Sequence, residues 1–332
     1  MQRFLIIQTA FIGDVVLATG MVEKLHQAYP GAQIDFLLRK GNEGLLANNP
    51  FLNEVLIWNK KENKFSNLLK MLSQIRSNKY DKVINLQRFS GTGFLTAFSN
   101  GKEKIGFDKN PFSFLFSKKV KHIMNDGRHE VERNHELIKS FTDEVFAKPK
   151  LYPSENDFAS IEKYTTQKYI CIAPSSVWFT KQYPVEKWIG FINLISPSYK
   201  IFLLGGKEDK DLCEKIASSS TNKNTKVLAG KLNFLQSAAL MKNAVMNYVN
   251  DSAPLHFASA MDAPVTAIFC STITAYGFGP LSTNSFIVET KEHLSCRPCT
   301  LHGRKACPLG HYKCAFTIET QQLLNSITNM HE

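Results

Sequence analysis

Four segments of the sequence place a charged side chain beside glycine or hydroxyl residues, each directly after an apolar run. The first is Ile12-Gly13-Asp14, which follows the run Phe4–Thr9. Gly13 permits a tight turn or the close approach of a ligand, and Asp14 stands at the start of a predicted helix. An aspartate there either caps the helix or presents a carboxylate that accepts a proton. The segment lacks the glycine pattern of a dinucleotide-binding fingerprint.

The second and third segments are typical of sites for anionic oxygen atoms and for hydroxyl groups. Ser175, Ser176 and Lys181 lie in the stretch PSSVWFTKQYP, and two hydroxyls with an ammonium group suit a phosphate. The stretch LLGGKE at 203–208 brings two glycines before Glu208, which can accept hydrogen bonds from ribose hydroxyls. The plainer interpretations are a solvated loop and an acid in the first turn of a helix, where the helix dipole favours it.

The fourth segment, VNDSAPLH at 249–256, marks the end of an apolar run and the start of a helix. Asp251 or Ser252 caps that helix, and Pro254 suits its first turn. The backbone N–H groups at such a helix start form an anion site, and His256 in the first turn is close enough to contact the same anion. Alternatively, His256 is a histidine packed in the core.

The composition is that of a globular chain with more than one domain. The chain has 332 residues, of which 43% are hydrophobic and 21% are charged. No stretch approaches the roughly 20 uninterrupted apolar residues of a membrane span. Asp14 interrupts the apolar amino terminus, and no cleavage site follows it, so we interpret this segment as a buried strand and expect a cytoplasmic protein.

The charge is basic and unevenly distributed. Lys and Arg number 40 against 29 Asp and Glu, which gives a net charge of +11. Residues 1–150 hold 23 basic and 15 acidic residues, whereas residues 151–332 hold 17 and 14. A basic first half indicates an anionic partner such as phosphate groups, a membrane surface or nucleic acid, although simple solubility explains it equally well.

Apolar runs alternate with segments of helical periodicity, which predicts parallel sheets covered by helices. In the first half we expect four strands, at Phe4–Thr9, Ile34–Arg39, Glu54–Asn59 and Lys82–Gln87. The expected helices there are Asp14–Tyr29, Leu68–Arg76 and Val131–Phe146. Residues 101–121 show no clear pattern.

The alternation restarts after a polar stretch that carries Pro153. We therefore predict a first domain over 1–152, a linker over 153–168 and a second domain over 169–332. The expected strands of the second domain are Tyr169–Ala173, Lys200–Leu204, Lys226–Leu228, Met246–Asn250 and Val265–Phe269, and the expected helices are Val185–Ile195, Lys207–Ser218, Phe234–Asn243 and Ala253–Met261. Two doubly wound α/β domains place a ligand site at the carboxyl ends of their strands, in a cleft between them.

The chain has seven cysteines. Three are scattered through apolar or helical segments, as free cysteines are: Cys171, Cys213 and Cys270. The other four form a carboxyl-terminal cluster: Cys296, Cys299, Cys307 and Cys314. With His302 and His311 this cluster has the composition of a zinc site, but its spacing matches no standard structural zinc pattern. We favour reduced thiols without a metal over a metal-binding knuckle.

Taken in order, these segments resemble glycosyltransferase family 9, the lipopolysaccharide heptosyltransferases. The resemblance covers essentially the whole chain. It rests on an ordered set of segments: GDVVLATGMVEKLHQAYPGAQIDFL, PSSVWFTKQYP, LLGGKED, LAGK at 228–231, NDSAPLHFASA and CRPC…ACPLGHYKC. The family implies a GT-B fold, in which two Rossmann-like domains face each other across a cleft. It also implies that the first domain binds the acceptor and the second binds an ADP-sugar.

The resemblance implies a role for each candidate residue. Asp14, beside Gly13, matches the aspartate proposed as the catalytic base, and Lys181 matches a lysine that holds the donor phosphate. The implied donor-binding set is Ser175, Ser176, Glu208, Asp251, Ser252, Ala253 and His256. Ala253 departs from the glycine common in the family, and it would be strained if that glycine needs a positive φ.

The implied function is inverting transfer of heptose from ADP-heptose to a lipopolysaccharide inner-core acceptor. ADP-sugar is a substrate here, so no cofactor is required. No D-x-D motif lies beside the donor loop, so this mechanism does not require a metal. The expected partners are the nucleotide-sugar and a lipid-linked anionic saccharide, with peripheral contact at the inner face of the cytoplasmic membrane and no nucleic acid. The alternatives are a nucleotide-sugar epimerase on the same fold and a non-enzymatic basic binding protein.

Overall fold

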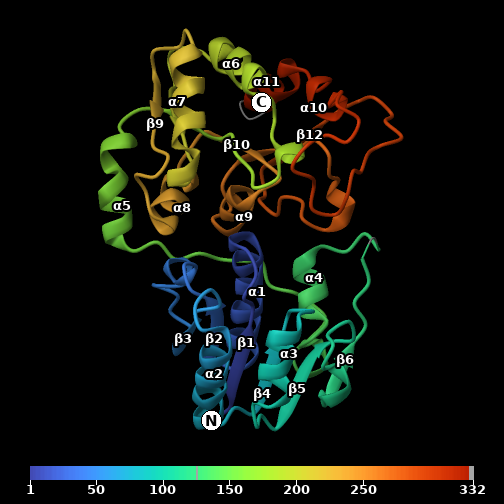
Figure 1. Cartoon of the computed structure of the whole chain (residues 1–332). Coiled ribbons are helices and arrows are strands. Elements are labelled where there is room, and N and C mark those ends of the chain that lie inside the picture. Colours follow the sequence, from blue (N-terminus) through green and yellow to red (C-terminus); the bar gives the residue numbers. More distant parts are fainter. Residues whose placement is uncertain (125, 329–332) are drawn as a thin grey trace. The chain divides into compact units, whose positions relative to one another are not determined.

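The computed structural model describes residues 1–124 and 126–328 and divides the chain into two compact units, Met1–Tyr152 and Pro153–Glu332 (Figure 1). Residues 153–168, predicted as a linker, belong to the second unit and contain helix α5 (Glu155–Ile161). Ser154 caps this helix, because its hydroxyl accepts a hydrogen bond from the Asp157 amide at 3.2 Å. The helix is short and mostly exposed, so its sequence carries little apolar periodicity.

The described residues of the first unit form a six-stranded parallel sheet with the strand order β3-β2-β1-β4-β5-β6. Its strands are β1 (Arg3–Ile7), β2 (Gln33–Arg39), β3 (Glu54–Trp58), β4 (Lys82–Asn85), β5 (Glu103–Phe107) and β6 (Lys118–Val120). Its helices are α1 (Ile12–Ala28), α2 (Lys64–Asn78), α3 (Ser90–Ala97) and α4 (Glu130–His135). Because right-handed crossovers leave β1 toward β2 and β4 toward β5, α1 and α3 cover opposite faces of this sheet.

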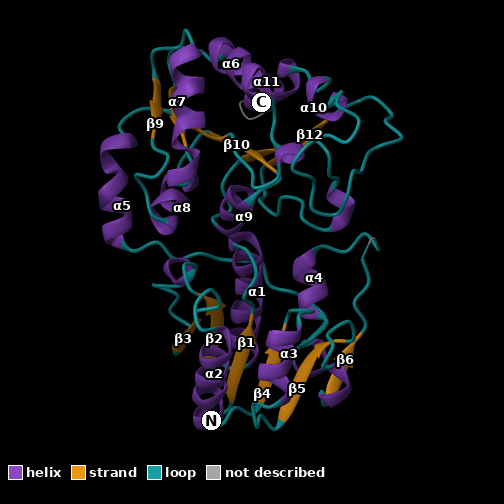
Figure 2. Ribbon diagram, viewed as in Figure 1, coloured by secondary structure: helices purple, strands orange, loops and turns teal. Residues whose placement is uncertain are grey.

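The second unit repeats this topology with the order β12-β11-β10-β7-β8-β9. Its strands are β7 (Tyr169–Ala173), β8 (Lys200–Leu203), β9 (Thr225–Val227), β10 (Met246–Asn250), β11 (Val265–Phe269) and β12 (Ser285–Glu289). Its further helices are α6 (Val185–Leu194), α7 (Lys210–Ser219), α8 (Phe234–Lys242), α9 (Ala253–Ala260), α10 (Lys313–Phe316) and α11 (Thr320–Thr328), as Figure 2 shows. Every residue of the central strands β7 and β10 is buried, as expected for a parallel sheet covered on both faces.

The predicted fold class, α/β with two doubly wound sheets, is confirmed, and most predicted elements are present. The pattern-free segment 101–121 contains the short strands β5 and β6. The helix predicted over Val131–Phe146 is wrong beyond His135, where the chain turns instead. His135 Nε2 contacts the Asp143 carbonyl oxygen at 2.7 Å and holds that turn. Among residues 1–124 and 126–328, no helix is long and apolar enough to cross a membrane.

Candidate functional site

The strand order reverses direction at one point in each sheet, between β1 and β4 in the first unit and between β7 and β10 in the second. In doubly wound folds, ligands bind outside the carboxyl ends of the strands at such a switch point. Asp14 follows β1, Lys181 follows β7 and Asp251 follows β10. The structure therefore places Asp14 at the switch point of the first sheet, and Lys181 and Asp251 at the switch point of the second.

In the first unit, Asp14 lies in the first turn of α1 and is half-buried. The N-cap residue is Phe11 and not Asp14, and the Asp14 carboxylate accepts a hydrogen bond from the Phe11 amide at 3.2 Å. Gly13 is the second residue of this helix, so of the two roles that it permits the tight turn is absent, and the close approach of a ligand stays a prediction. The carboxylate thus caps the helix from inside its first turn, where the helix dipole stabilises its negative charge.

A second carboxylate lies near Asp14 and is not apparent from the sequence. Glu130, the first residue of α4, is buried and forms an ion pair with Arg133 at 2.8 Å. Burial raises the pKa of Glu130, the Arg133 charge opposes that shift, and the charge of Asp14 adds to it. The positive charge of Arg88, which follows β4, also opposes the rise in the pKa of Glu130. The only sequence signal for this group is the stretch HEVERNH at 129–135, which holds two glutamates and one arginine.

Cationic and polar groups border the same sheet edge. The Thr9 hydroxyl donates to Gln87 Oε1 at 2.6 Å and so joins the loops after β1 and β4. Lys60 donates to the Thr9 carbonyl oxygen at 3.3 Å and also to the Thr9 hydroxyl oxygen. Burial, followed by the positive charge of Arg39, lowers the pKa of Lys60 to about 8. This edge therefore combines a carboxylate with partly buried donors.

In the second unit, the structure brings Lys181 and the loop after β10 together. Lys181 Nζ lies 2.7 Å from Asp251 Oδ2, and both side chains are largely buried. The same oxygen accepts a hydrogen bond from the Thr272 hydroxyl at 2.6 Å. Asp251 therefore orients the lysine, because its carboxylate is already engaged by two partners. Thr272 is a further member of this group that the sequence did not indicate.

Asn250 joins the two loops at this switch point. Its Nδ2 donates to the Pro174 carbonyl oxygen at 2.7 Å, and its Oδ1 accepts from the Tyr183 amide at 3.0 Å. Asn250 is fully buried, so both bonds form away from solvent. The half-buried Ser175 and Ser176 lie in the loop that these bonds fix.

Helix α9 begins directly after these residues, with Ser252 as its N-cap residue in extended conformation. Ala253 is the first residue of the helix, so the strain expected from a positive φ does not arise. Pro254 lies in the first turn, as predicted. His256 is buried within α9, and its ring centroid lies 6.4 Å from that of Phe278.

The glycine pair after β8 forms a turn closed by Asp209. The Gly206 amide donates to Asp209 Oδ2 at 2.8 Å, whereas Glu208 is exposed. A Cβ atom at Gly206 would lie 2.7 Å from Glu208 Oε2, so the carboxylate folds over the glycine backbone. Gly230 of the LAGK segment has φ +74° and donates its amide to the Gly205 carbonyl oxygen at 2.9 Å. Strand order places this turn beside the Lys181 loop.

The carboxyl-terminal segment, residues 296–314, packs against the loop that carries Lys181. The Thr180 amide donates to the Arg304 carbonyl oxygen at 3.1 Å, and the Arg304 amide donates to Thr180 Oγ1 at 2.8 Å. The Tyr312 hydroxyl donates to the Phe179 carbonyl oxygen at 3.0 Å and lies against the Gln182 carbonyl oxygen. The segment therefore holds the position of Lys181, a role that the sequence did not suggest.

The cysteines of this segment line a cavity of about 230 Å³ together with His311. Their thiols are unpaired, and burial with the neighbouring thiol charges raises the pKa of Cys314 to about 11. Within the described part of the chain, no three His, Cys, Asp or Glu side chains are placed to hold a metal ion. The prediction of free thiols is confirmed for the scattered cysteines Cys171, Cys213 and Cys270, and the structure shows that all three are buried.

If the second unit binds the ADP-sugar that the resemblance implies, we predict that Gly303→Ala weakens binding of ADP about tenfold while Gly310→Ala leaves it unchanged. Both glycines have a positive φ, so both substitutions introduce backbone strain. A Cβ atom at Gly303 would lie only 2.9 Å from Lys181 Cγ, whereas one at Gly310 meets no atom within 4 Å. Calorimetric titration of ADP measures the difference. Equal affinities in the two variants would show that this segment does not position Lys181.

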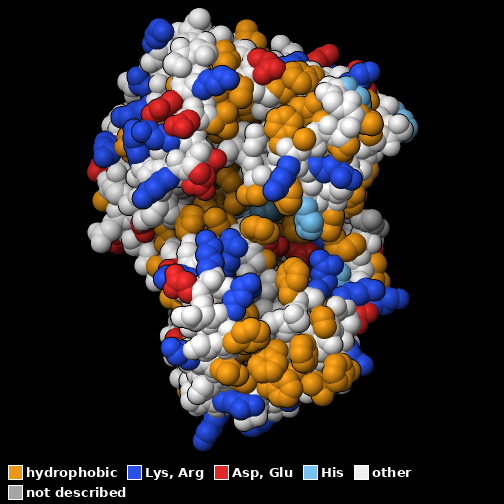
Figure 3. Space-filling model, in the orientation of Figure 1, with side chains coloured by type: hydrophobic (Ala, Val, Ile, Leu, Met, Phe, Trp, Pro, Cys, Tyr) orange, Lys and Arg blue, Asp and Glu red, His pale blue; other side chains and the backbone are white. Residues whose placement is uncertain are grey.

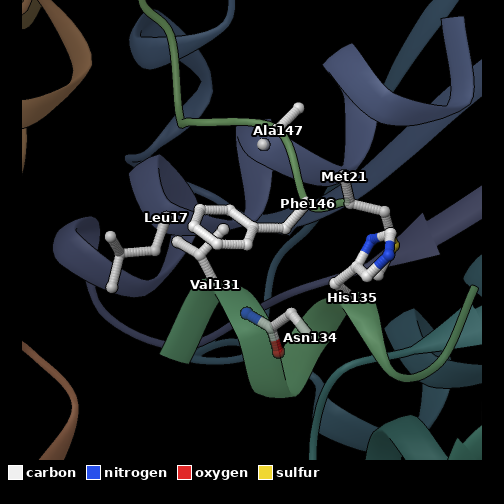
Figure 4. A pocket seen from close by; sticks show the side chains of 8 residues that line it. Leu17, Met21, Val131, Asn134, His135, Phe146 and Ala147 are labelled. Atoms are coloured by element: carbon white, nitrogen blue, oxygen red, sulfur yellow. The ribbon is translucent and has the colours of Figure 1, made fainter. Parts of the chain in front are cut away.

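A small cavity between α1 and α4 is no ligand site. Figure 4 shows its lining side chains, among them Leu17, Met21 and Phe146. Its volume is about 10 Å³, which is room for no more than about one water molecule. It is therefore a packing defect of the first unit.

Two doubly wound α/β units, each with charged side chains at the switch point of its sheet, define a class of proteins that bind ligands at the carboxyl ends of their strands. The family model of glycosyltransferase family 9 (heptosyltransferase) matches residues 68–313. The chain belongs to this family and is a glycosyltransferase. The predicted family is thereby confirmed, and the alternative of a non-enzymatic binding protein is wrong.

Relatives and solved structures agree with this assignment. The chain is 28% identical over 281 residues to lipopolysaccharide heptosyltransferase 3 of Escherichia coli, covering 79% of this chain and 82% of that protein. Its fold is similar to that of a family 9 glycosyltransferase from Veillonella parvula, with a TM-score of 0.87, 20% identity and coverage of 99% and 97%. It is also similar to E. coli ADP-heptose lps heptosyltransferase II, with a TM-score of 0.82, 18% identity and coverage of 99% and 98%. The predicted GT-B class is confirmed by these folds.

Proposed function

We propose that this chain transfers heptose, with inversion, from ADP-heptose to an inner-core acceptor of lipopolysaccharide. The observation that carries the proposal is the group at the switch point of the second sheet, where Lys181, the buried Asp251 and the start of α9 lie together. A lysine and the amide groups of a helix start are what a diphosphate requires. Family membership and the names of the relatives supply the sugar and the acceptor.

In this proposal the second unit binds the donor. Lys181 and the amides at the start of α9 hold the diphosphate, with the Ser175 and Ser176 hydroxyls beside it. Glu208 accepts hydrogen bonds from the ribose hydroxyls, since it is the exposed acid of the neighbouring turn. Asp251 contributes indirectly, because its carboxylate engages Lys181 and would repel a phosphate if it faced one.

Transfer then proceeds as a single displacement at the anomeric carbon. Asp14 takes the proton of the acceptor hydroxyl as that oxygen bonds to the carbon, and the bond from the carbon to the diphosphate oxygen breaks. The negative charge that develops on the departing ADP is stabilised by Lys181 and the start of α9. No cofactor and no metal take part in this scheme, and ADP-heptose is consumed as a substrate.

The acceptor in this proposal is a lipid-linked anionic saccharide, so the protein works in peripheral contact with the inner face of the cytoplasmic membrane. The net charge of +8 on residues 1–150, on the unit that carries Asp14, supports this part.

A ligand screen followed by a transfer assay tests the proposal. ADP-heptose at 100 times its dissociation constant is expected to stabilise the protein by about 2.7 kcal/mol, which gives a clear rise in Tm. UDP-sugars serve as the control and are expected to give no rise. With a lipopolysaccharide acceptor, the transfer assay should then yield a product whose anomeric configuration is opposite to that of the donor. Epimerisation of the donor without acceptor would contradict the proposal.

A further inference from the structure

A cluster of phenylalanine side chains lies on the surface of the first unit, outside the candidate site. The ring centroids of Phe94 and Phe98 are 4.8 Å apart, and Phe112 lies 6.1 and 6.3 Å from them. Phe114 extends the cluster and stacks on Phe112 with an interplanar angle of 17°. Figure 3 shows a continuous hydrophobic area over α3 and its neighbours on this face.

The outer members of this aromatic patch, which comprises Phe94, Phe98, Phe112, Phe114 and Leu115, do not serve the core. Phe114 is 71% exposed, Leu115 is 41% exposed and Phe98 is 38% exposed. Single exposed apolar side chains are normal on a protein surface, but a contiguous group marks a surface that contacts something else. The patch is therefore a candidate contact surface.

The backbone that carries the patch is fixed by buried polar groups. Asn110 is 2% exposed, and its Nδ2 donates to the carbonyl oxygens of Gln87 at 2.9 Å and Phe89 at 3.2 Å. Its Oδ1 accepts from the Phe112 amide at 2.9 Å. A side chain on Gly93 would overlap Asn110, so this glycine allows the segment to pack on α3. The rings are thus presented by an ordered structure and not by a loose loop.

The segment that carries the patch is strongly basic. Residues 88–121 contain seven Lys and Arg but only two acidic residues, and so hold a net charge of +5. Both acidic side chains are already engaged: Glu103 pairs with Lys82 at 2.5 Å, and Asp108 accepts from the His122 amide at 2.9 Å. Lys109 and Lys119 are exposed. Apolar rings together with lysines are typical of a surface that binds anionic lipids. The rings enter the headgroup region, and the lysines bind the headgroups.

We infer that the aromatic patch with its flanking lysines is the surface by which this chain docks on an anionic lipid bilayer. The inference rests on the proposed function, in which the acceptor is lipid-linked. Helix α3 links the patch to the candidate site, because its N-cap residue Phe89, 65% exposed, follows the carboxyl end of β4 beside the Thr9–Gln87 pair. Docking here holds the first unit against the membrane that carries its acceptor.

Vesicle binding of the full chain tests the inference. The double variant Phe114→Glu/Leu115→Glu is expected to lower binding to phosphatidylglycerol-containing vesicles by about tenfold or more, since it removes the inserting groups and adds repulsion. The matched control Phe65→Glu, at an 84% exposed phenylalanine on α2, is expected to bind as the wild type does. Lys109→Glu/Lys119→Glu should weaken binding to these vesicles but not to neutral phosphatidylcholine vesicles.

Three results would overturn the inference. One is wild-type affinity in the Phe114→Glu/Leu115→Glu variant, and another is absence of vesicle binding by the wild type. The third is a wild-type dimer that this variant converts to a monomer without any vesicle binding, which would make the patch a self-association surface. The transfer assay keeps the two proposals separate. The variant should retain the wild-type rate on a detergent-dispersed acceptor, whereas vesicle binding without any transfer would refute only the proposed function.

Discussion

Replacing Asp14 with Asn is expected to lower the rate of heptose transfer by about 100- to 10,000-fold, because the amide cannot accept the acceptor hydroxyl proton. The fold should remain intact. The Asp14 carboxylate accepts a hydrogen bond from the Phe11 amide, and the amide oxygen of an asparagine can accept the same bond. Initial rates with saturating donor and acceptor, together with Tm, measure the two effects separately.

Two controls make this experiment decisive. Asp143→Asn removes an exposed carboxylate of the same unit that pairs with Lys24 at 2.5 Å, and it should leave the rate unchanged. Donor affinity should also be unchanged in Asp14→Asn, because we place the donor on the second unit. A variant with near wild-type rates would show that Asp14 serves only to cap α1.

Replacing Lys181 with Ala is expected to reduce transfer by about 100- to 1,000-fold, the usual cost of removing one preorganised contact to a developing charge. Binding of ADP should weaken along with binding of ADP-heptose, because both carry the diphosphate. The substitution also leaves the largely buried Asp251 carboxylate without its cationic partner, so Tm is expected to fall. Titration of ADP and thermal unfolding report on the two consequences.

The double variant Lys181→Met/Asp251→Asn separates binding from stability. It removes both charges, and the amide oxygen introduced at position 251 can still accept the Thr272 hydrogen bond, so Tm should recover while ADP binding stays weak. Lys210→Ala is the matched control, since Lys210 pairs with Glu214 at 3.5 Å on the exposed surface of α7. Recovery of ADP binding in the double variant would mean that Lys181 acts on the fold and not on the phosphate.

Much of the fold could be predicted because buried parallel strands have a distinctive sequence. Runs such as Tyr169–Ala173 and Val265–Phe269 are buried at every position and mostly apolar, so they can be recognised locally. Short edge elements do not have this property. Strand β6 has three residues, none of them buried, and α3 carries two glycines. Their structure comes from pairing and packing with neighbours, which single-chain periodicity does not reveal.

The sequence by itself determined the fold class, the family and the segments that carry candidate chemistry, because each depends on residue type and order along the chain. Only the tertiary structure decided which groups meet. The Lys181–Asp251 ion pair joins loops after two neighbouring strands, Glu130 approaches Asp14 from more than 100 positions away, and Arg304 bonds the Lys181 loop. The Phe94–Phe114 aromatic patch likewise exists because Asn110 folds one segment onto α3. Such contacts depend on strand order and loop path, and these are set by the packing of the whole unit.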